Sequence, residues 1–401
     1  MPSYTIQPAS KAASPAISRL SATEAQWHTV VLRSALAFVA AGLVFVSGAS
    51  AFAGSNGRLA YFYAAEVWVM NADGTSARSL GDGLSPSWSP NGRHLTFDTI
   101  LDRNYDVWVM GADGTGRRRV TTNPAPDYFS SWSPDARFIV FTSDRGGEGG
   151  EDLFVIAADG TGERRLTTDP GPDWGAAWSP DGTRIAFGGN ARGNLEIEVV
   201  NVDGTARIAL TDHPDRDYDP AWSPDGTRIA FTSERDGNPN VYVMNADGTG
   251  VTQLTDDPAG DYRPAWSPDG TTLAFESSRD DRAFDRDVFV MNADGSDERR
   301  LRNANENARD VDWQPTIDLT LAVRRSGRFV VVRVTNRSPA AAQRVRVSFT
   351  AGKSRRVREL GSIAPNETGA VSLASPRRTI VLASAWQLDP NPADNRRVAR
   401  R

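Results

Sequence analysis

The sequence has no cysteine, only two lysines and only three histidines in 401 residues. Without cysteine the chain can form neither a disulfide framework nor a thiolate metal site or nucleophile. His28, His94 and His213 are widely spaced, which disfavours a cluster of imidazoles. There is also no Gly-x-Ser-x-Gly nucleophile turn, no phosphate-binding loop and no dinucleotide fingerprint. These absences disfavour the common enzyme classes and predict no catalytic residue, no metal and no cofactor.

Long apolar runs are scarce as well, and the clearest one spans residues 34–47. Arg33 precedes it, and small-x-small triplets ending at Ala51 and Ala53 follow it. A positively charged residue, a short apolar stretch and a cleavage site of small residues are typical of a secretory signal, which we place within residues 1–54. The run is shorter than the roughly 20 residues of a membrane span. We therefore expect a secreted or extracytoplasmic protein, in the periplasm or cell wall after cleavage, with an uncleaved anchor as the alternative.

Charge is divided unevenly along the chain. Residues 316–401 carry 16 arginines and one lysine against three aspartates and two glutamates, a net charge of +12. The whole chain has a net charge of −5, so the segment 56–315 is strongly acidic. An acidic body joined to a basic module suggests a different partner for each part.

One phrase recurs through the acidic segment. Trp-Ser-Pro is usually followed by Asp-Gly. A divergent (worn) copy of the phrase, Val-Asp-Trp-Gln-Pro, lies at 311–315. A second phrase, Asn-Ala-Asp-Gly-Thr or close to it, lies between the copies. Successive tryptophans are 44 to 47 residues apart, a period typical of a β-propeller blade. The tryptophans are Trp88, Trp132, Trp178, Trp222, Trp266 and Trp313.

Each period predicts four short strands. In the copy that begins at Pro220 we expect strands at 220–222, 228–231, 241–244 and 251–254, because these runs are rich in β-forming residues. Ser-Pro-Asp-Gly predicts the first turn. Asp247-Gly248 predicts a type I′ hairpin, which needs a positive φ at both residues. An all-β fold follows.

The two ends of the array complement each other. The first copy begins at 57–62 with the strand that is second in the repeat, and no Trp-Ser-Pro strand precedes it. The last copy, at 308–315, consists only of the strand that is first in the repeat. Together they make one whole unit, so we predict a six-bladed β-propeller over 55–315 with a composite closing blade. Closure removes the unpaired strand edges that would otherwise recruit other chains.

These repeats resemble a known family. Trp-Ser-Pro-Asp-Gly-Thr-Arg-Ile-Ala-Phe at 222–231 and Val-Met-Asn-Ala-Asp-Gly-Thr at 243–249 are similar to the PD40, WD-like repeats of TolB-type propellers. The resemblance covers about 57–315. It implies a fold that is exposed outside the cytoplasm and binds partner proteins. The family's namesake carries an α/β domain before its propeller, whereas here we expect only the signal and a few residues before residue 55.

Most aspartates of the repeats are predicted to form turns rather than a catalytic site. The tryptophans are predicted to pack the blades rather than to line a ligand cage. The turn aspartates are Asp135, Asp181, Asp225 and Asp269 in the Ser-Pro-Asp turns and Asp73, Asp113, Asp159, Asp203, Asp247 and Asp294 in the hairpins.

An acid–aromatic pair in the loop before four of the six inner strands is the candidate binding site, and the two blades around the closure lack this pair. Arginines in the loops after the second strands share this face, with Arg103 as a further candidate. Either these charges pair between neighbouring blades and only hold the ring, or they form a polar, aromatic mouth for a protein segment, a glycan or a cation. The candidates are Asp127, Tyr128, Asp173, Trp174, Asp217, Tyr218, Asp261 and Tyr262, with Arg145, Arg192, Arg235 and Arg279.

Three carboxylates within five residues, Asp215, Asp217 and Asp219, are also a conceivable calcium site. The pattern lacks further recognisable ligands, so no metal is predicted from it.

The C-terminal module, 316–401, alternates in strand fashion and predicts a small β-sandwich. The phrases at 334–338 and 360–365 resemble CARDB-type, immunoglobulin-like adhesion modules. Its positive charge suits an anionic cell-envelope polymer or the acidic propeller itself, or else is a plain solvated surface.

Together these observations predict a monomeric, extracytoplasmic binding scaffold with a protein or glycan partner and no nucleic acid. The alternative is an exported hydrolase or lyase that acts on peptide or polysaccharide through an unrecognised site.

Overall fold

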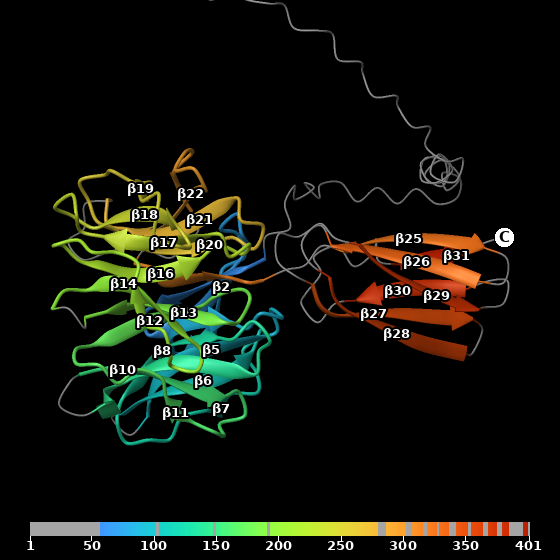
Figure 1. The fold of residues 1–401 in the computed structure, drawn as a ribbon, viewed down its shortest axis with the longest axis horizontal. Coiled ribbons are helices and arrows are strands. Elements are labelled where there is room, and N and C mark those ends of the chain that lie inside the picture. Colours follow the sequence, from blue (N-terminus) through green and yellow to red (C-terminus); the bar gives the residue numbers. More distant parts are fainter. Residues whose placement is uncertain are drawn as a thin grey trace, which may run out of the picture. The chain divides into compact units, whose positions relative to one another are not determined.

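The computed structural model describes most of the chain from residue 57 onward, in an almost entirely β-stranded arrangement (Figure 1). The predicted signal region, Arg103 and Arg192 lie outside the described residues. A single 3-10 turn, η1 (Asp144–Gly146), interrupts the strands in the described part. The described residues are 57–101, 104–146, 150–190, 193–279, 286–301, 307–315, 319–326, 329–336, 342–351, 354–363, 368–374, 379–384 and 396–399.

Residues 59–313 form six four-stranded antiparallel sheets. Five of them are simple meanders, in which each strand pairs with the next along the chain. The five are β4–β7 (Leu84–Trp88, His94–Leu101, Asn104–Gly111, Arg118–Arg119), β8–β11 (Asp127–Trp132, Phe138–Ser143, Asp152–Ala157, Arg164–Arg165), β12–β15 (Asp173–Trp178, Arg184–Gly189, Glu196–Asn201, Ile208–Ala209), β16–β19 (Asp217–Trp222, Arg228–Ser233, Asn240–Asn245, Thr252–Gln253) and β20–β23 (Asp261–Trp266, Thr272–Ser277, Asp287–Asn292, Arg299–Arg300).

The remaining sheet joins the two ends of the array. Its order is β24 (Arg309–Trp313), β1 (Leu59–Tyr63), β2 (Glu66–Met70) and β3 (Arg78–Asp82). Leu59 pairs with Trp313, and the Gln314 amide donates to the Arg58 carbonyl at 2.7 Å. The innermost strands contact one another in chain order, β20 contacts β24, and β24 contacts β4.

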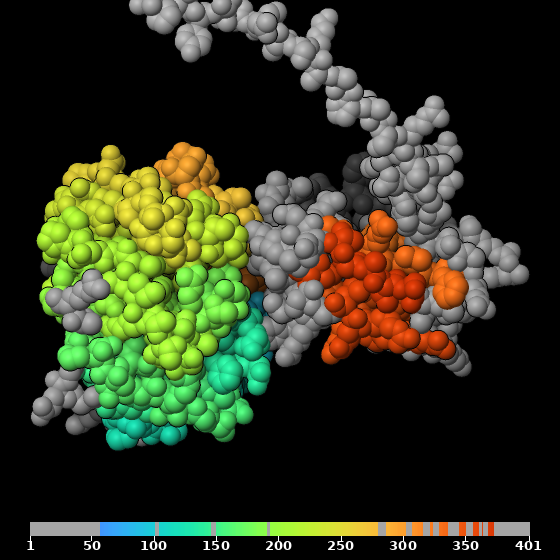
Figure 2. Space-filling view, viewed as in Figure 1, coloured from blue at the N-terminus to red at the C-terminus, as the bar shows by residue number. Residues whose placement is uncertain are grey.

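Apolar side chains fill the space between successive sheets, which adjoin one another in the space-filling view (Figure 2). Trp222 packs in one cluster with Val199 of the preceding sheet and Phe231 of its own. Arg184 of the preceding sheet also lies over the Trp222 ring, 4.9 Å from its centroid. The tryptophan therefore holds two sheets together, as the sequence predicted, through burial and a cation–π contact.

The aspartates of the Ser-Pro-Asp turns are structural, as predicted. The Ser223 hydroxyl donates to Oδ1 of Asp225 at 2.6 Å, and the Thr227 amide donates to the same oxygen at 3.0 Å. These bonds close the turn from inside and lower the pKa of the Asp225 carboxyl against the opposing effect of burial.

The prediction of type I′ hairpins is wrong. Gly248 has a φ of 87°, whereas Asp247 is not left-handed. The Gly248 amide donates to the Asn245 carbonyl and the Asn245 amide to the Thr249 carbonyl, so the loop has three residues with one left-handed position. A Cβ at Gly248 would lie 2.7 Å from the Leu210 carbonyl of the preceding sheet, which adds a second reason for glycine.

The C-terminal strands form two further antiparallel sheets. Alternate apolar residues of both sheets share one buried cluster, which includes Val332 of β26 and Val347 of β27. One sheet contains β25 (Leu319–Ser326), β26 (Phe329–Asn336) and β29 (Thr368–Ala374), and the other β28 (Ser354–Ile363), β27 (Ala342–Ala351), β30 (Thr379–Ser384) and β31 (Arg396–Ala399).

Candidate functional site

The predicted acid–aromatic pairs lie in the innermost strands and not in loops, which corrects the prediction from sequence. Each pair supplies the first two residues of β8, β12, β16 or β20. The aspartates are fully buried at these strand starts: Asp127, Asp173, Asp217 and Asp261.

Three of the aspartates pair with the predicted arginines, but within one sheet and not between neighbouring sheets. Nη2 of Arg145 lies 2.5 Å from Asp127, that of Arg235 lies 2.8 Å from Asp217, and that of Arg279 lies 2.7 Å from Asp261. Each pair links the innermost strand to the loop after the second strand of the same sheet. The expectation of a charge network between blades is therefore wrong at these positions.

Asp173 has a different partner, which the sequence did not reveal. Arg207, just before β15, donates to both carboxylate oxygens of Asp173 at 2.8 Å. Arg207 also binds Glu198 at 2.5 Å. Burial outweighs the arginine partner and raises the pKa of Asp173 to about 6. Burial likewise raises the pKa of Asp261 to about 6.

The aromatic halves of the pairs are half-buried and contact residues of their own sheet or of a neighbouring one. Trp174 of β12 stacks on Tyr218 of β16, with 6.3 Å between ring centroids and 8° between planes. The Tyr128 hydroxyl donates to Glu151 at 2.6 Å, and Arg286 lies over the Tyr262 ring at 3.6 Å. A cavity of about 340 Å³ lies beside Trp174. Ligand binding by these aromatic and charged residues stays a prediction.

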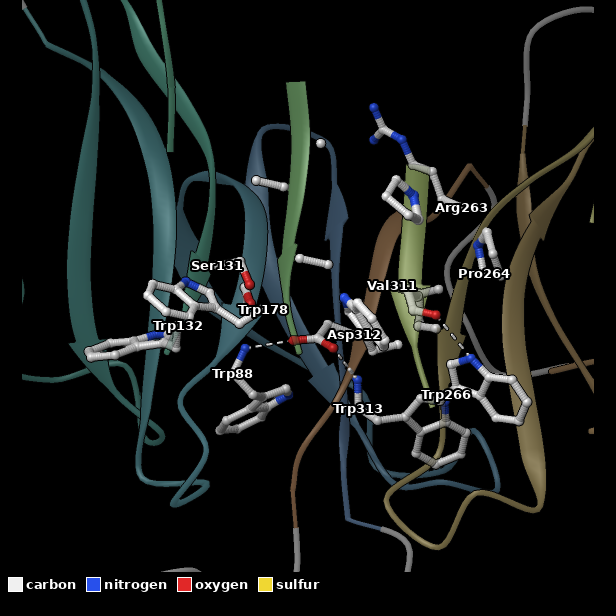
Figure 3. A pocket seen from close by; sticks show the side chains of 18 of the residues that line it. Trp88, Ser131, Trp132, Trp178, Arg263, Pro264, Trp266, Val311, Asp312 and Trp313 are labelled. Carbon is white, nitrogen blue, oxygen red and sulfur yellow. Dashed lines mark hydrogen bonds between the residues drawn. The ribbon is translucent and has the colours of Figure 1, made fainter. Parts of the chain in front are cut away.

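A larger cavity, of about 440 Å³, runs between the innermost strands (Figure 3). All six sheets contribute to its lining, and so do the prolines of the Trp-Ser-Pro turns and Pro315 of the worn copy. Along each innermost strand, side chains facing the cavity alternate with side chains packed between the sheets, as expected for strands.

One ring of cavity-lining residues has an unusual backbone. Five of its six members are non-glycine residues with φ between 45° and 53°, and the sixth is a glycine with φ of 65°. Each lies where the pairing of the innermost strand shifts register, the mark of a β-bulge. Non-glycine residues in this region cost free energy and concentrate at functional sites. The ring is Ser85, Phe129, Gly175, Asp219, Arg263 and Asp310.

Side chains of the preceding sheet hold this strained backbone in place. The Phe129 amide donates to Asp98 at 2.9 Å, the Arg263 amide to Thr232 at 3.0 Å, and the Asp310 amide to Glu276 at 2.6 Å. These three of the six bulges are therefore fixed by specific hydrogen bonds between sheets.

Arg263 occupies the centre of the bulge ring. It pairs with Asp219 at 3.4 Å and with Asp310, which belong to the sheets on its two sides. Its guanidinium also lies over the Phe129 ring, 5.1 Å from the centroid. Phe129 belongs to a sheet that is not adjacent to that of Arg263 in the order of contacts, so the side chain reaches across the axis. Burial raises the pKa of the Asp219 carboxyl although Arg263 opposes this.

Nearer the tryptophans, a second ring is made of small side chains and one acid. Two serines and three alanines stand at five positions, and an aspartate stands at the sixth: Ser87, Ser131, Ala177, Ala221, Ala265 and Asp312. The Trp88 amide donates to Asp312 at 2.7 Å and the Trp313 amide at 2.9 Å (Figure 3). Burial outweighs these bonds and raises the pKa of Asp312 to about 6.

The sequence prediction missed both rings. The residues were visible in the repeat, because each stands at a fixed distance before its tryptophan. Asp312 is one of the departures, together with Gln314, that set the last copy apart, and it is the acid of the second ring.

Among the residues that the structure describes, no group of three or more His, Asp or Glu side chains is placed to hold a metal ion. Asp215, Asp217 and Asp219 therefore do not form the calcium site that their spacing suggested. Likewise, the described part of the chain contains no helix with the length and apolar character of a membrane span.

Six four-stranded antiparallel sheets arranged around an axial cavity define an all-β repeat protein of the β-propeller class. The model of the TolB beta propeller domain, PD40, matches residues 64–169 and 178–383. The chain belongs to this family. No match was found among the curated proteins.

Solved structures agree with the class of fold. TolB from Acinetobacter baumannii is 20% identical with a TM-score of 0.58, over 65% of this chain and 67% of that chain. A protein from Agrobacterium tumefaciens assigned as a TolB is 24% identical with a TM-score of 0.52, over 66% and 100%. A chain of a nidogen–laminin complex is 13% identical with a TM-score of 0.52, over 64% and 98%. At these identities the likeness shows the fold alone.

Proposed function

We propose that the protein is an extracytoplasmic binding scaffold whose axial cavity receives a segment of a partner protein. In this proposal residues 55–315 form a closed six-bladed propeller, with β24 and β1–β3 as the composite blade. Residues 316–401 form an immunoglobulin-like β-sandwich that spaces or anchors the propeller. The apolar run at 34–47 supports export.

The cavity is the observation that carries this proposal. Its volume of about 440 Å³ lies in the range of ligand pockets, and it is too small for a folded domain. Small side chains such as Ser131 and Ala221 keep it open, and hydrogen-bonded strands make its wall rigid. A preformed, rigid pocket binds an extended segment at little cost in ordering its own residues.

Family and structural likeness support a role in protein binding. The nidogen–laminin neighbour belongs to a complex of two proteins. The cavity lining of the described residues offers carboxylates, one arginine and serine hydroxyls, without a histidine. The alternative, an exported hydrolase or lyase, would use the same carboxylates and hydroxyls and is distinguished by experiment.

A cavity-filling variant tests the proposal. Ser131→Trp places an indole in the second ring, and we expect it to abolish capture of the partner from an envelope extract by the tagged full chain. Val251→Trp is the matched control, because Val251 is 38% exposed and does not line the cavity. Captured proteins are identified by cross-linking and mass spectrometry.

Three outcomes distinguish the alternatives. Equal capture by the wild type and both variants contradicts binding in the cavity. Loss of capture in Ser131→Trp alone supports it. Release of cleaved peptide or polysaccharide from the extract by the wild type favours the enzyme alternative.

The basic module has its own proposed partner, an anionic cell-envelope polymer. Arg356 and Arg358 are exposed on β28. Arginines supply nearly all of the positive charge of residues 316–401. Retention on cell-wall material is expected to fall steeply between low and high salt, because exposed charges are screened by ions. Retention that does not change with salt would contradict an electrostatic interaction.

A further inference from the structure

The charges of the axial cavity are not balanced. Its ionisable lining consists of three carboxylates and one guanidinium: Asp219, Asp310, Asp312 and Arg263. Arg263 is engaged by Asp219 and Asp310 in the bulge ring. Asp312 lies at the other level of the cavity, near the tryptophans (Figure 3).

Asp312 has no cationic partner among the described residues. Among those residues, it accepts hydrogen bonds from the amides of Trp88 and Trp313 and from the side chain of Ser87. Backbone amides stabilise a carboxylate only in part, and a carboxylate removed from water attracts a positive charge strongly. The neighbouring positions of its ring carry only methyl or hydroxymethyl groups, which leaves room beside the acid.

We propose that the cavity binds its ligand through one organic cation, an ammonium or guanidinium head group that pairs with Asp312. The inference rests on the proposed function, since it names the chemistry recognised in the same cavity. An aliphatic stem would lie along the small residues Ala177, Ala221 and Ala265.

A cation is the class of ligand that the lining favours. An anion would meet three carboxylates, and a neutral group would leave Asp312 uncompensated. A divalent metal lacks the ligands it needs, because no suitable group of three acidic or histidine side chains occurs in the described part of the chain. A single carboxylate without a cationic partner, set among small alanine and serine side chains, suits a monovalent head group instead.

The same head group has two sources, a free amine or a lysine or arginine side chain of a polypeptide. For the first source the probes are n-butylamine, its neutral counterpart 1-butanol and its anionic counterpart butyrate. For the second they are acetyl-Ala-Lys-Ala-amide and the same peptide with norleucine in place of lysine. Titrations of the full chain at constant ionic strength are followed by tryptophan fluorescence, since Trp88 and Trp313 flank Asp312.

We expect the wild type to bind at least one cationic probe roughly tenfold more tightly than its neutral counterpart, and butyrate least, as for a buried charged hydrogen bond. Asp312→Asn is expected to remove this preference, because the amide keeps the size and loses the charge. Asp256→Asn is the matched control, since Asp256 is exposed and outside the cavity lining. It should leave the preference unchanged.

The wild-type comparison needs no variant, so misfolding of Asp312→Asn cannot obscure the result. Equal binding of cationic and neutral probes, binding of neither, or an unchanged preference in Asp312→Asn overturns the proposal. Preference for the lysine peptide alone identifies a polypeptide source, and preference for butylamine identifies a small amine; both support it. If Ser131→Trp blocks partner capture while no probe discriminates by charge, the proposed function stands and this inference fails. If Ser131→Trp leaves capture unchanged, the proposed function itself fails.

Discussion

Five innermost strands follow one pattern, and β24 departs from it. The five have serine or alanine directly before the tryptophan, whereas β24 has Asp312. Four of them begin with a buried aspartate, whereas the corresponding positions before β24 and β4 hold Ala308 and Gly83. The residues shared by the copies build the sheets and their packing. The residues in which the copies differ, among them Asp219, Arg263 and Asp312, give the cavity its charge.

The largest expected effect comes from removing the departing strand. Deletion of 308–315 leaves β1 with an unpaired edge and removes Trp313 from its cluster. We expect loss of the cooperative unfolding transition and aggregation, because exposed edges pair with other chains. Size-exclusion chromatography and thermal unfolding measure both. A soluble monomer with unchanged unfolding would contradict the closing role of β24.

A milder pair of variants sharpens the same comparison. Trp222→Ala and Trp313→Ala each remove a buried indole from between two sheets. If β24 packs as a regular strand does, each should cost about 3 to 5 kcal/mol in the free energy of unfolding. A much smaller cost for Trp313→Ala in denaturant titrations would show that the closing strand is held weakly.

The next effect concerns the buried aspartate at the start of four innermost strands, which β24 does not have. Asp261→Ala leaves Arg279 without its buried partner, although Glu298 at 2.5 Å still compensates part of the charge. We expect a loss of about 2 to 3 kcal/mol, somewhat below that for breaking a fully buried pair. Asp256→Ala, at an exposed position, should change stability by less than about 0.5 kcal/mol. Similar losses for both variants would contradict a structural role for the pair.

The smallest effect is on the pH dependence of stability. Asp312 has its pKa raised to about 6, so between pH 4 and pH 6 the folded state binds more protons than the unfolded state. Stability therefore falls as pH rises through this window. Asp312→Asn should make the fall shallower by about 1.4 kcal/mol for each pH unit of this window, since one pKa unit corresponds to that free energy.

Denaturant titrations at pH 4, 5, 6 and 7 measure this slope. The pKa values of Asp173 and Asp261 are also raised to about 6, so part of the fall in stability with pH remains in the Asp312→Asn variant. The turn carboxyls Asp181 and Asp225 have lowered pKa values and act below pH 4, outside the window. An identical slope in the wild type and Asp312→Asn would contradict a desolvated Asp312.

Much of the fold could be predicted because the same short pattern occurs six times. The strand after Asp225 and the strand before Asp247 lie where the β-forming residues stand, as β17 and β18 show. The type I′ turn was wrong because Asp-Gly fits more than one hairpin, and only the backbone reveals which residue is left-handed. The first strand was predicted too short, which misplaced the acid–aromatic pair in a loop.

The site was harder to predict, because its rings combine residues from all six copies. Nothing local in the sequence around Arg263 indicates that its side chain meets Asp310, Asp219 and Phe129. The β-bulges that direct these side chains inward have no single residue type in common. Arg207 was missed for a related reason, since its partner Asp173 belongs to a distant strand of the same sheet.

The pairing of β24 with β1 also sets an order of events during folding. Arg58 and Gln314 bond across 256 residues, whereas each of the other five sheets is built from one continuous stretch of chain. Those five can form as the polypeptide emerges, but the first sheet must wait until residue 313 is available. Closing so long a loop is entropically costly and slows folding. Until then β1 stays an open edge, so the interval between synthesis of the first and last strands is when the chain is most exposed to misassociation.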